Sequence, residues 1–155
     1  MKLKSSAFKD GERIPDIYVM KEVGGENMSL PFEWSDAPDE TRSFAFTMID
    51  HHPVANNWIH WMVINIPSSS DNICEGASGR NMTVGSREFR NSFGKGCYGG
   101  PQPPVGSGDH PYVCTLYAIS VRVLYLDLTI SLSEFKAGLE GRILAQASMT
   151  GIYGV

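Results

Sequence analysis

Residues 43–67 read SFAFTMIDHHPVANNWIHWMVINIP and contain two runs that are typical of β-strands. In residues 44–49, Phe and Met alternate with smaller or branched residues up to Asp50, where His-His-Pro predicts a turn. The second run, residues 58–66, is apolar on both of its alternating faces. One of these faces carries Trp58, His60, Met62, Ile64 and Ile66. A strand that is apolar on both faces is typical of the inside of a sheet, so we predict a central strand here.

Further strands and one helix are predicted downstream. A third strand is expected over residues 112–119, after which the alternation resumes through Leu124, Leu126 and Leu128, and a last core strand is expected over residues 143–153. Ser131 and Glu134 have the spacing of a helix capping box, and nearby glycines keep the expected helix short. The pattern predicts a mainly β protein, an antiparallel β-sandwich with one or two short helices.

Length and composition limit the classes of protein to consider. The chain has 155 residues, which fits a single domain over 1–155. Its 13 Lys+Arg and 17 Asp+Glu give a net charge of −4, and a protein that binds nucleic acid would carry a basic surface instead. No secretory signal follows the N-terminus, and polar residues interrupt the apolar region 113–132. We expect a soluble, cytoplasmic protein with no nucleic-acid partner and no stable membrane insertion.

The three cysteines, Cys74, Cys97 and Cys114, are an odd set without CxxC spacing. Neither a disulfide framework nor a cysteine zinc site is predicted, and we expect reduced thiols. Cys97 as a nucleophile is an alternative, although no hydrolase signature surrounds it.

The rare ionisable residues lie at the expected strand ends, where binding sites are often built. Asp50 ends one strand, His60 opens the next, and His110 and Tyr112 flank the start of the third. His110 and Tyr112 are two positions apart and therefore point to the same face of an extended strand. The preceding loop is rich in Gly and Pro, and its free N–H groups could converge on an anion. This grouping predicts a phosphate or carboxylate site, in which Asp50 orients and charges an imidazole.

Other interpretations of the same residues stay open at this point. A histidine of this kind can be a buried core residue with satisfied hydrogen bonds, and His51, His52 and Pro53 can form a simple polar turn. His52 with His60 or His110 could bind a metal ion, although the spacing does not require one. The glycines lack the spacing of a nucleotide-binding loop.

Five segments of the chain resemble one known family, the phosphatidylethanolamine-binding proteins. This family includes the animal Raf kinase inhibitor protein, plant flowering regulators and small prokaryotic members, and the resemblance is closest to the prokaryotic branch. The segments are DHHP with WIHWMVINIP, YGGPQPPVGSGDHPYVCTLYAI, NMSLPFEWSDAP, SGRNM and GRILAQASMTGIYG. The resemblance implies an antiparallel β-sandwich with a small pocket at one end that accepts phosphate, acetate, cacodylate or a phospholipid head group.

The resemblance also implies which residues form that pocket. Asp50 matches the first aspartate of the family's DPDxP segment, and His60 matches the histidine before the apolar strand. His110 and Tyr112 match the histidine and the aromatic residue of the GxHRY segment. Gly100 and Gln102 lie in the YGGPxPP segment, where family members offer backbone N–H groups to the anion, and Tyr98 is expected to pack beneath it.

The chain departs from the family pattern at two positions of these segments. His52 stands where the family has a second aspartate, in a turn one residue shorter, and Pro111 stands where the family has arginine. If His52 faces the pocket, an imidazole in place of a carboxylate makes one wall less repulsive to anions. The chain also ends soon after Tyr153, so we expect no long C-terminal helix of the kind that animal relatives carry.

The leading functional expectation is a non-catalytic binding module without cofactor or metal. Its ligand would be a small anion such as phosphate or phosphorylethanolamine, bound by Asp50, His52, His60, Gly100, Gln102, His110 and Tyr112. From the resemblance we also expect a homodimer and a protein partner such as a kinase. The alternatives are a module that inhibits a protease or kinase through the pocket rim, and a metal-assisted hydrolase that uses His52, His60 and His110.

Overall fold

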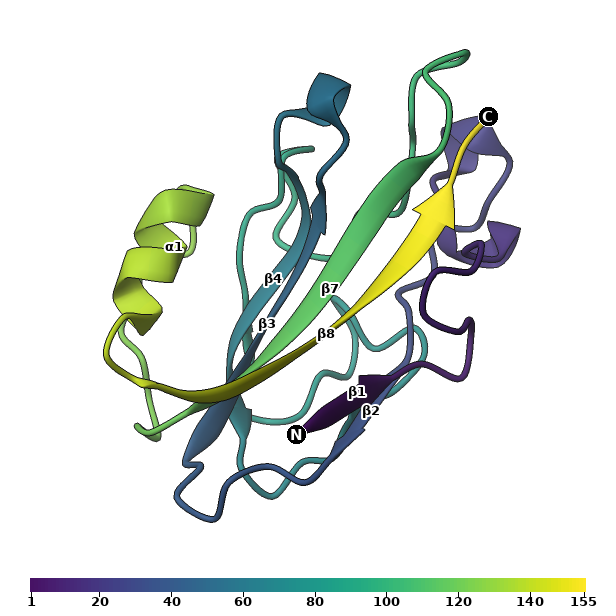
Figure 1. Cartoon of the computed structure of the whole chain (residues 1–155). Coiled ribbons are helices and arrows are strands. Elements are labelled where there is room, and N and C mark those ends of the chain that lie inside the picture. The colour runs from purple at the N-terminus through teal and green to yellow at the C-terminus, as the bar shows by residue number, and fades with distance from the viewer.

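The computed structural model describes residues 1–155 and contains two antiparallel β-sheets packed against each other (Figure 1). The large sheet has the strand order β6-β4-β3-β7-β8 and the small sheet has the order β1-β2-β5. The strands of the large sheet are β6 (Arg87–Glu88), β4 (Trp58–Pro67), β3 (Ser43–Asp50), β7 (His110–Ile119) and β8 (Ile143–Tyr153). Those of the small sheet are β1 (Lys2–Lys4), β2 (Phe32–Ser35) and β5 (Asn72–Ile73). The predicted antiparallel β architecture is confirmed.

Strand β3 lies in the middle of the large sheet and is buried along its whole length. Phe44 and Phe46 face the small sheet, where Trp34 and Phe32 pack against them with ring centroids 5.2 and 4.8 Å apart. Ala45 faces the opposite side and joins a second apolar cluster. The alternation read from residues 44–49 is therefore confirmed.

Strand β4 is buried on both faces, as predicted, but it does not alternate regularly. Its pairing with β3 shifts register twice, and at each shift β4 has one residue more than β3, which is a β-bulge. Asn65 lies at one bulge with a left-handed φ of 60°. The expected face shared by Met62, Ile64 and Ile66 is therefore wrong, because Ile66 lies in the other core cluster, with Trp61.

Strand β7 begins at His110, two residues before the predicted start, and pairs with β3 and β8. The alternation at Leu124, Leu126 and Leu128 produces no strand, because these residues lie in a loop over residues 121–131. The backbone of Leu124 bonds to the side chain of Asn65 instead of to a neighbouring strand. Strand β8 has the predicted bounds, but it is an edge strand with a largely exposed first half.

The predicted helix is confirmed as α1 (Leu132–Leu139), and three short 3-10 turns lie at Asp16–Tyr18 (η1), Lys21–Val23 (η2) and Pro53–Ala55 (η3). Ser131 Oγ accepts from the N–H of Glu134 at 3.2 Å, and the Glu134 carboxylate accepts from the N–H of Ser131 at 2.8 Å. This capping box fixes the start of the helix. Phe135 and Leu139 are buried against the face of the large sheet that points away from the small sheet.

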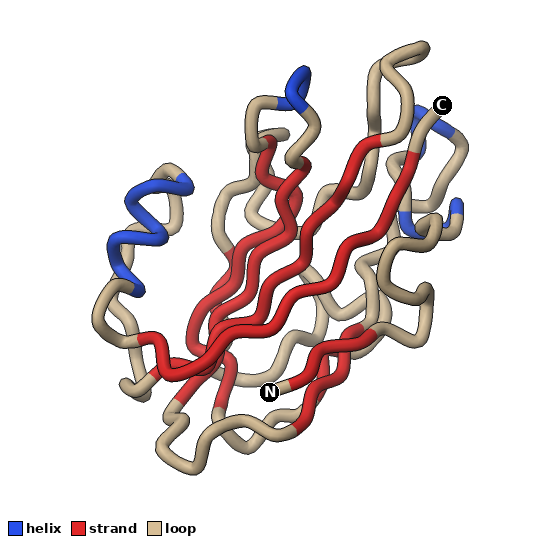
Figure 2. Tube along the Cα trace, in the orientation of Figure 1, coloured by secondary structure: helices blue, strands red, loops and turns tan.

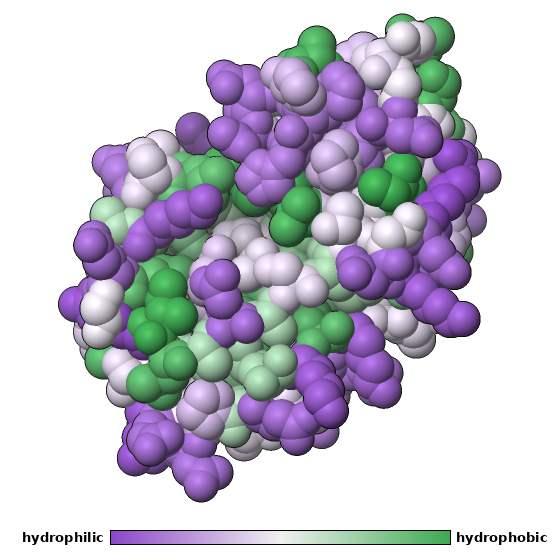
Figure 3. All heavy atoms as spheres, viewed as in Figure 1, coloured by the Kyte–Doolittle hydropathy of each residue, from purple (hydrophilic) through white to green (hydrophobic).

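The surface carries apolar side chains between α1 and the beginning of β8, where Ile143 and Leu144 are 41% and 40% exposed (Figure 3). None of the helices has the length and apolar character needed to cross a bilayer. The connection between β3 and β4 and the loop before β7 lie at the same end of the large sheet, at the top of Figure 2.

Candidate functional site

The ends of β3, β4 and β7 bring distant parts of the chain together. Antiparallel pairing places Asp50 opposite both Trp58 and Tyr112. Because paired residues of antiparallel strands point to the same face, these three side chains share one face of the sheet. Asp50 therefore lies beside Tyr112, and it also contacts His110. The expected grouping of these three residues is observed.

Asp50, His110 and Ser107 form a chain of hydrogen bonds at this sheet end. The Nδ1 atom of His110 lies 2.6 Å from Asp50 Oδ2, and its Nε2 atom lies 2.8 Å from Ser107 Oγ. The Ser107 hydroxyl donates to the Pro104 carbonyl at 2.6 Å, so its lone pairs remain for His110. Both ring nitrogens of His110 therefore have hydrogen-bond partners within the protein.

His52 supports this pair from outside the pocket. Its ring stacks on His110 with centroids 3.9 Å apart and planes 11° apart. Its backbone N–H donates to Asp50 Oδ1 at 2.8 Å. Its Nδ1 accepts from the N–H of Val54 at 3.2 Å and so caps η3. His52 is not among the lining residues, so it does not change the charge of a pocket wall as expected.

His60 is buried at the back of the site. Its Nδ1 donates to the Gly99 carbonyl at 2.7 Å, and its ring packs edge-on against Tyr112 and Phe93. Burial lowers the pKa of His60 to about 4, so the ring is neutral near pH 7. His60 therefore contributes shape and position but no positive charge.

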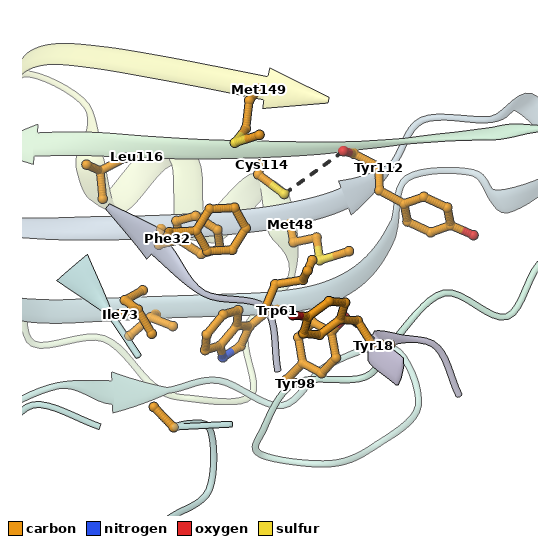
Figure 4. Packing of buried hydrophobic residues seen from close by; sticks show 14 of the residues in the cluster. Tyr18, Phe32, Met48, Trp61, Ile73, Tyr98, Tyr112, Cys114, Leu116 and Met149 are labelled. Atoms are coloured by element: carbon orange, nitrogen blue, oxygen red, sulfur yellow. Dashed lines mark hydrogen bonds between the residues drawn. The ribbon is translucent and has the colours of Figure 1, made fainter. Parts of the chain in front are cut away.

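Tyr112 is completely buried, and its hydroxyl has no hydrogen-bond partner within the protein. The ring lies at the end of the core cluster, with the hydroxyl directed away from the other labelled residues (Figure 4). Burial, assisted by the Asp50 charge, raises the pKa of Tyr112 well above its usual value, so the hydroxyl keeps its proton. It is a hydrogen-bond donor with nothing in the protein to receive the bond.

A pocket of about 310 Å³ lies in front of these side chains. Its polar residues are Asp50, His60, Gln102, His110 and Tyr112, and its apolar walls come from η3, the loop before β7, Phe93 and Trp58. Trp58 is 39% exposed and Val54 is 60% exposed, so apolar surface continues out to solvent. Polar groups thus lie beside an apolar wall, as in many small-molecule sites.

Two glycines of the loop before β7, Gly99 and Gly100, do not offer the free N–H groups that were expected there. The N–H of Gly100 donates to Asn27 Oδ1 at 2.7 Å, and that of Gly99 donates to the His60 carbonyl at 2.9 Å. The N–H of Gly100 is therefore not free for the anion contact that the resemblance implied. Glycine is needed at position 100 because a Cβ there would lie 2.2 Å from the Tyr18 carbonyl oxygen. Tyr98 packs beneath the loop as expected and donates to that same carbonyl.

Ser107, Phe93 and Val54 are among the residues of the site that were outside the sequence predictions. Ser107 bonds to His110, while Phe93 and Val54 form walls of the pocket. Ser107 has a signal in the sequence, because it lies three positions before His110 in a turn rich in glycine. Phe93 and Val54 have none, since contacts across the fold place them.

The metal alternative requires ligand groups that are free to converge. Both nitrogens of His110 and the Nδ1 atoms of His52 and His60 have protein partners. No group of three or more His, Cys, Asp or Glu side chains is arranged to hold a metal ion. For Cys97, burial raises the thiol pKa, which disfavours the nucleophilic thiolate.

Comparison with known proteins decides the family. A sequence profile described as phosphatidylethanolamine-binding protein matches residues 4–154. The chain belongs to this family. Among the relatives of the chain, a UPF0098 protein of Aquifex aeolicus is 35% identical over 99% of this chain and 88% of its own length. The UPF0098 protein YbhB of Escherichia coli is 33% identical over 99% of both chains.

Solved structures show the same fold for other members of the phosphatidylethanolamine-binding family. The crystal structure of Escherichia coli YbcL, described as a new member of the mammalian PEBP family, superposes with a TM-score of 0.90. It is 31% identical and covers 99% of this chain and 98% of its own. A putative PEBP homologue from Chlamydia trachomatis, CT736, gives a TM-score of 0.85 at 30% identity, with 99% and 97% of the two chains covered.

Proposed function

We propose that the pocket at the ends of β3, β4 and β7 binds a small anionic group, either phosphate or a phosphorylated head group. The observation that carries this proposal is the Tyr112 hydroxyl, which is buried in the pocket wall without a hydrogen-bond partner. An unpaired buried hydroxyl costs about 1–3 kcal/mol, and an anion in the pocket would recover that free energy by accepting a hydrogen bond from it.

The electrostatics of the neighbouring pair support an anionic ligand. Asp50 is nearly buried, and both of its oxygens already accept hydrogen bonds, from His110 and from the backbone of His52. Its negative charge is therefore offset before any ligand arrives. These hydrogen bonds leave the pocket with less repulsion toward an anion than a free carboxylate would exert.

The walls of the pocket favour a ligand that also has an apolar part. Trp58 packs edge-on against Phe93 with ring centroids 5.4 Å apart, and both residues line the pocket. An anionic group beside Tyr112 would leave room for attached carbon atoms against Trp58. The proposal therefore expects phosphorylethanolamine to bind more tightly than phosphate.

Binding without catalysis is part of the proposal. Asp50, His110 and Ser107 have the order of a Ser-His-Asp triad, but a triad needs the serine hydroxyl to donate to the imidazole. The Ser107 hydroxyl donates to the Pro104 carbonyl instead. Ser107 is thus held as a support for His110 and not as an activated nucleophile. Regulation of a kinase and formation of a homodimer stay predictions from family resemblance.

Isothermal titration with phosphate and with phosphorylethanolamine tests the proposal. We expect the wild-type protein and the exposed-site control His51→Ala to bind both ligands. His110→Ala, checked for folding by circular dichroism, should lose both, and Trp58→Ala should lose the preference for phosphorylethanolamine. Unchanged binding in folded His110→Ala would refute the site.

A further inference from the structure

A second pocket of about 540 Å³ lies at the opposite end of the same strands. It is formed by the residues before β3, the turn after β4, the start of β6 and the loop after β7. Three of the residues that line it are arginines, Arg42, Arg87 and Arg122, and Ser68 and Ser69 add hydroxyl groups. We call this site the arginine pocket.

The arginine pocket has no carboxylate to balance its charge. Its lining contains no Asp or Glu, and none of its three arginines forms an ion pair. Glu88, next to Arg87, is turned elsewhere and accepts hydrogen bonds from Trp61, Ser78 and the Gly79 backbone. The arginine pocket therefore carries three exposed positive charges without a carboxylate in its lining, in a chain of net charge −4.

The backbone around the arginine pocket is held in a fixed shape. Asn65 is nearly buried, and its left-handed φ of 60° lies inside strand β4, where only a bulge accommodates it. Its side chain donates to the Leu124 carbonyl at 3.1 Å and accepts from the Leu124 N–H at 2.8 Å. Ser43 Oγ donates to the Val121 carbonyl at 2.7 Å. These bonds position the loop that carries Arg122.

The same loop exposes an aromatic ring at the pocket. Tyr125 is 91% exposed and lines the pocket, and the neighbouring Val123 is 42% exposed. An aromatic ring that is so open to water contributes little to folding, because it buries almost no apolar area. Beside guanidinium groups, it offers a flat face on which a planar ligand can stack.

We propose that the arginine pocket binds a small organic compound that carries two or more phosphate groups and a planar ring. The arginines match this chemistry because a guanidinium group bonds to phosphate oxygens through two parallel N–H donors. Three guanidinium groups can together bond to the oxygens of more than one phosphate group. The planar ring of the ligand would stack on the side chain of Tyr125. This site is separate from the proposed anion pocket at the other end of the sheet.

Titration with inorganic pyrophosphate and with ADP at low ionic strength tests this proposal. We expect both compounds to bind, and Arg42→Gln and Arg122→Gln each to weaken both by about tenfold or more. Tyr125→Ala should weaken ADP by about tenfold and leave pyrophosphate unchanged. The matched control Arg80→Gln, which removes the same charge from an exposed arginine outside this pocket, should bind as the wild type does.

The outcome is distinguishable from a failure of the proposed anion pocket, because His110→Ala should leave intact the part of pyrophosphate and ADP binding that Arg42→Gln and Arg122→Gln remove. Absence of binding to both compounds would overturn the arginine pocket. So would equal losses in Arg122→Gln and Arg80→Gln, since that result reports only net charge. If Tyr125→Ala binds ADP as tightly as the wild type, the assignment of the planar ring is wrong.

Discussion

Asp50 and His110 lie 60 positions apart in the chain, and 2.6 Å separates Oδ2 of the first from Nδ1 of the second. Both side chains are almost fully excluded from solvent. Oδ1 of the same carboxylate accepts a hydrogen bond from the backbone N–H of His52. Asp50 therefore connects the turn after β3 to the start of β7. Asp50 therefore holds the wall of the pocket in place and orients His110.

Asp50→Asn tests this role of the carboxylate. The amide cannot accept hydrogen bonds at both positions, and it leaves His110 without its negative partner. We expect the free energy of unfolding to fall by about 3 kcal/mol, measured by urea denaturation. The control Asp39→Asn, at an exposed carboxylate without a salt bridge, should change it by less than about 0.5 kcal/mol. Equal stability of the two variants would contradict a structural role of the pair.

The buried neutral His60 makes stability depend on pH. Its pKa is lowered from 6.5 to about 4, so between these values the unfolded chain binds a proton that the folded chain does not. The free energy of unfolding therefore rises with pH across this window and levels off above it, by up to about 3 kcal/mol from this residue. Denaturation at a series of pH values should show a smaller slope for His60→Gln than for wild type. His51→Gln, at an exposed histidine, should keep the full slope.

The glycine at position 100 is required by close packing of the backbone. A Cβ there would lie 2.2 Å from the Tyr18 carbonyl oxygen, whereas a Cβ at Gly96 would have no atom within 4 Å. We expect Gly100→Ala to destabilise the fold by about 2 kcal/mol or more and Gly96→Ala to be tolerated, as measured by thermal unfolding. If Gly100→Ala keeps wild-type stability but loses phosphate binding, the result would contradict this structural role and support a direct contact between Gly100 and the anion.

The parts of the fold that follow from local sequence could be predicted. Residues 44–49 alternate without a bulge, and Ser131 with Glu134 forms a capping box within one turn of chain, so β3 and the start of α1 were found. The bulge at Asn65 could not be predicted, because it depends on register against β3. The strands of the small sheet have two to four residues, which is too short for a periodic signal.

The same distinction holds for the site. The strand-end residues Asp50, His110 and Tyr112 were grouped correctly, because antiparallel strands bring their ends together. The hydrogen bond of the Gly100 N–H could not be predicted, since its partner, Asn27, lies 73 positions away. His52 lies outside the pocket lining and stacks against His110. This contact joins distant parts of the chain, so no local sequence pattern predicts it.

The central claim, that the Tyr112 hydroxyl is held for an anionic ligand, is tested most directly by Tyr112→Phe against Tyr98→Phe. Tyr98 is also buried, but its hydroxyl donates to the Tyr18 carbonyl at 2.8 Å. For Tyr98→Phe we expect the free energy of unfolding to fall by about 1 kcal/mol and phosphate affinity to stay unchanged.

For Tyr112→Phe we expect the free energy of unfolding to stay the same or rise by about 1 kcal/mol, because an unpaired buried hydroxyl is removed. Its affinity for phosphate, measured by isothermal titration, should fall by about tenfold. Wild-type phosphate affinity in Tyr112→Phe, together with a loss of stability equal to that of Tyr98→Phe, would contradict the account.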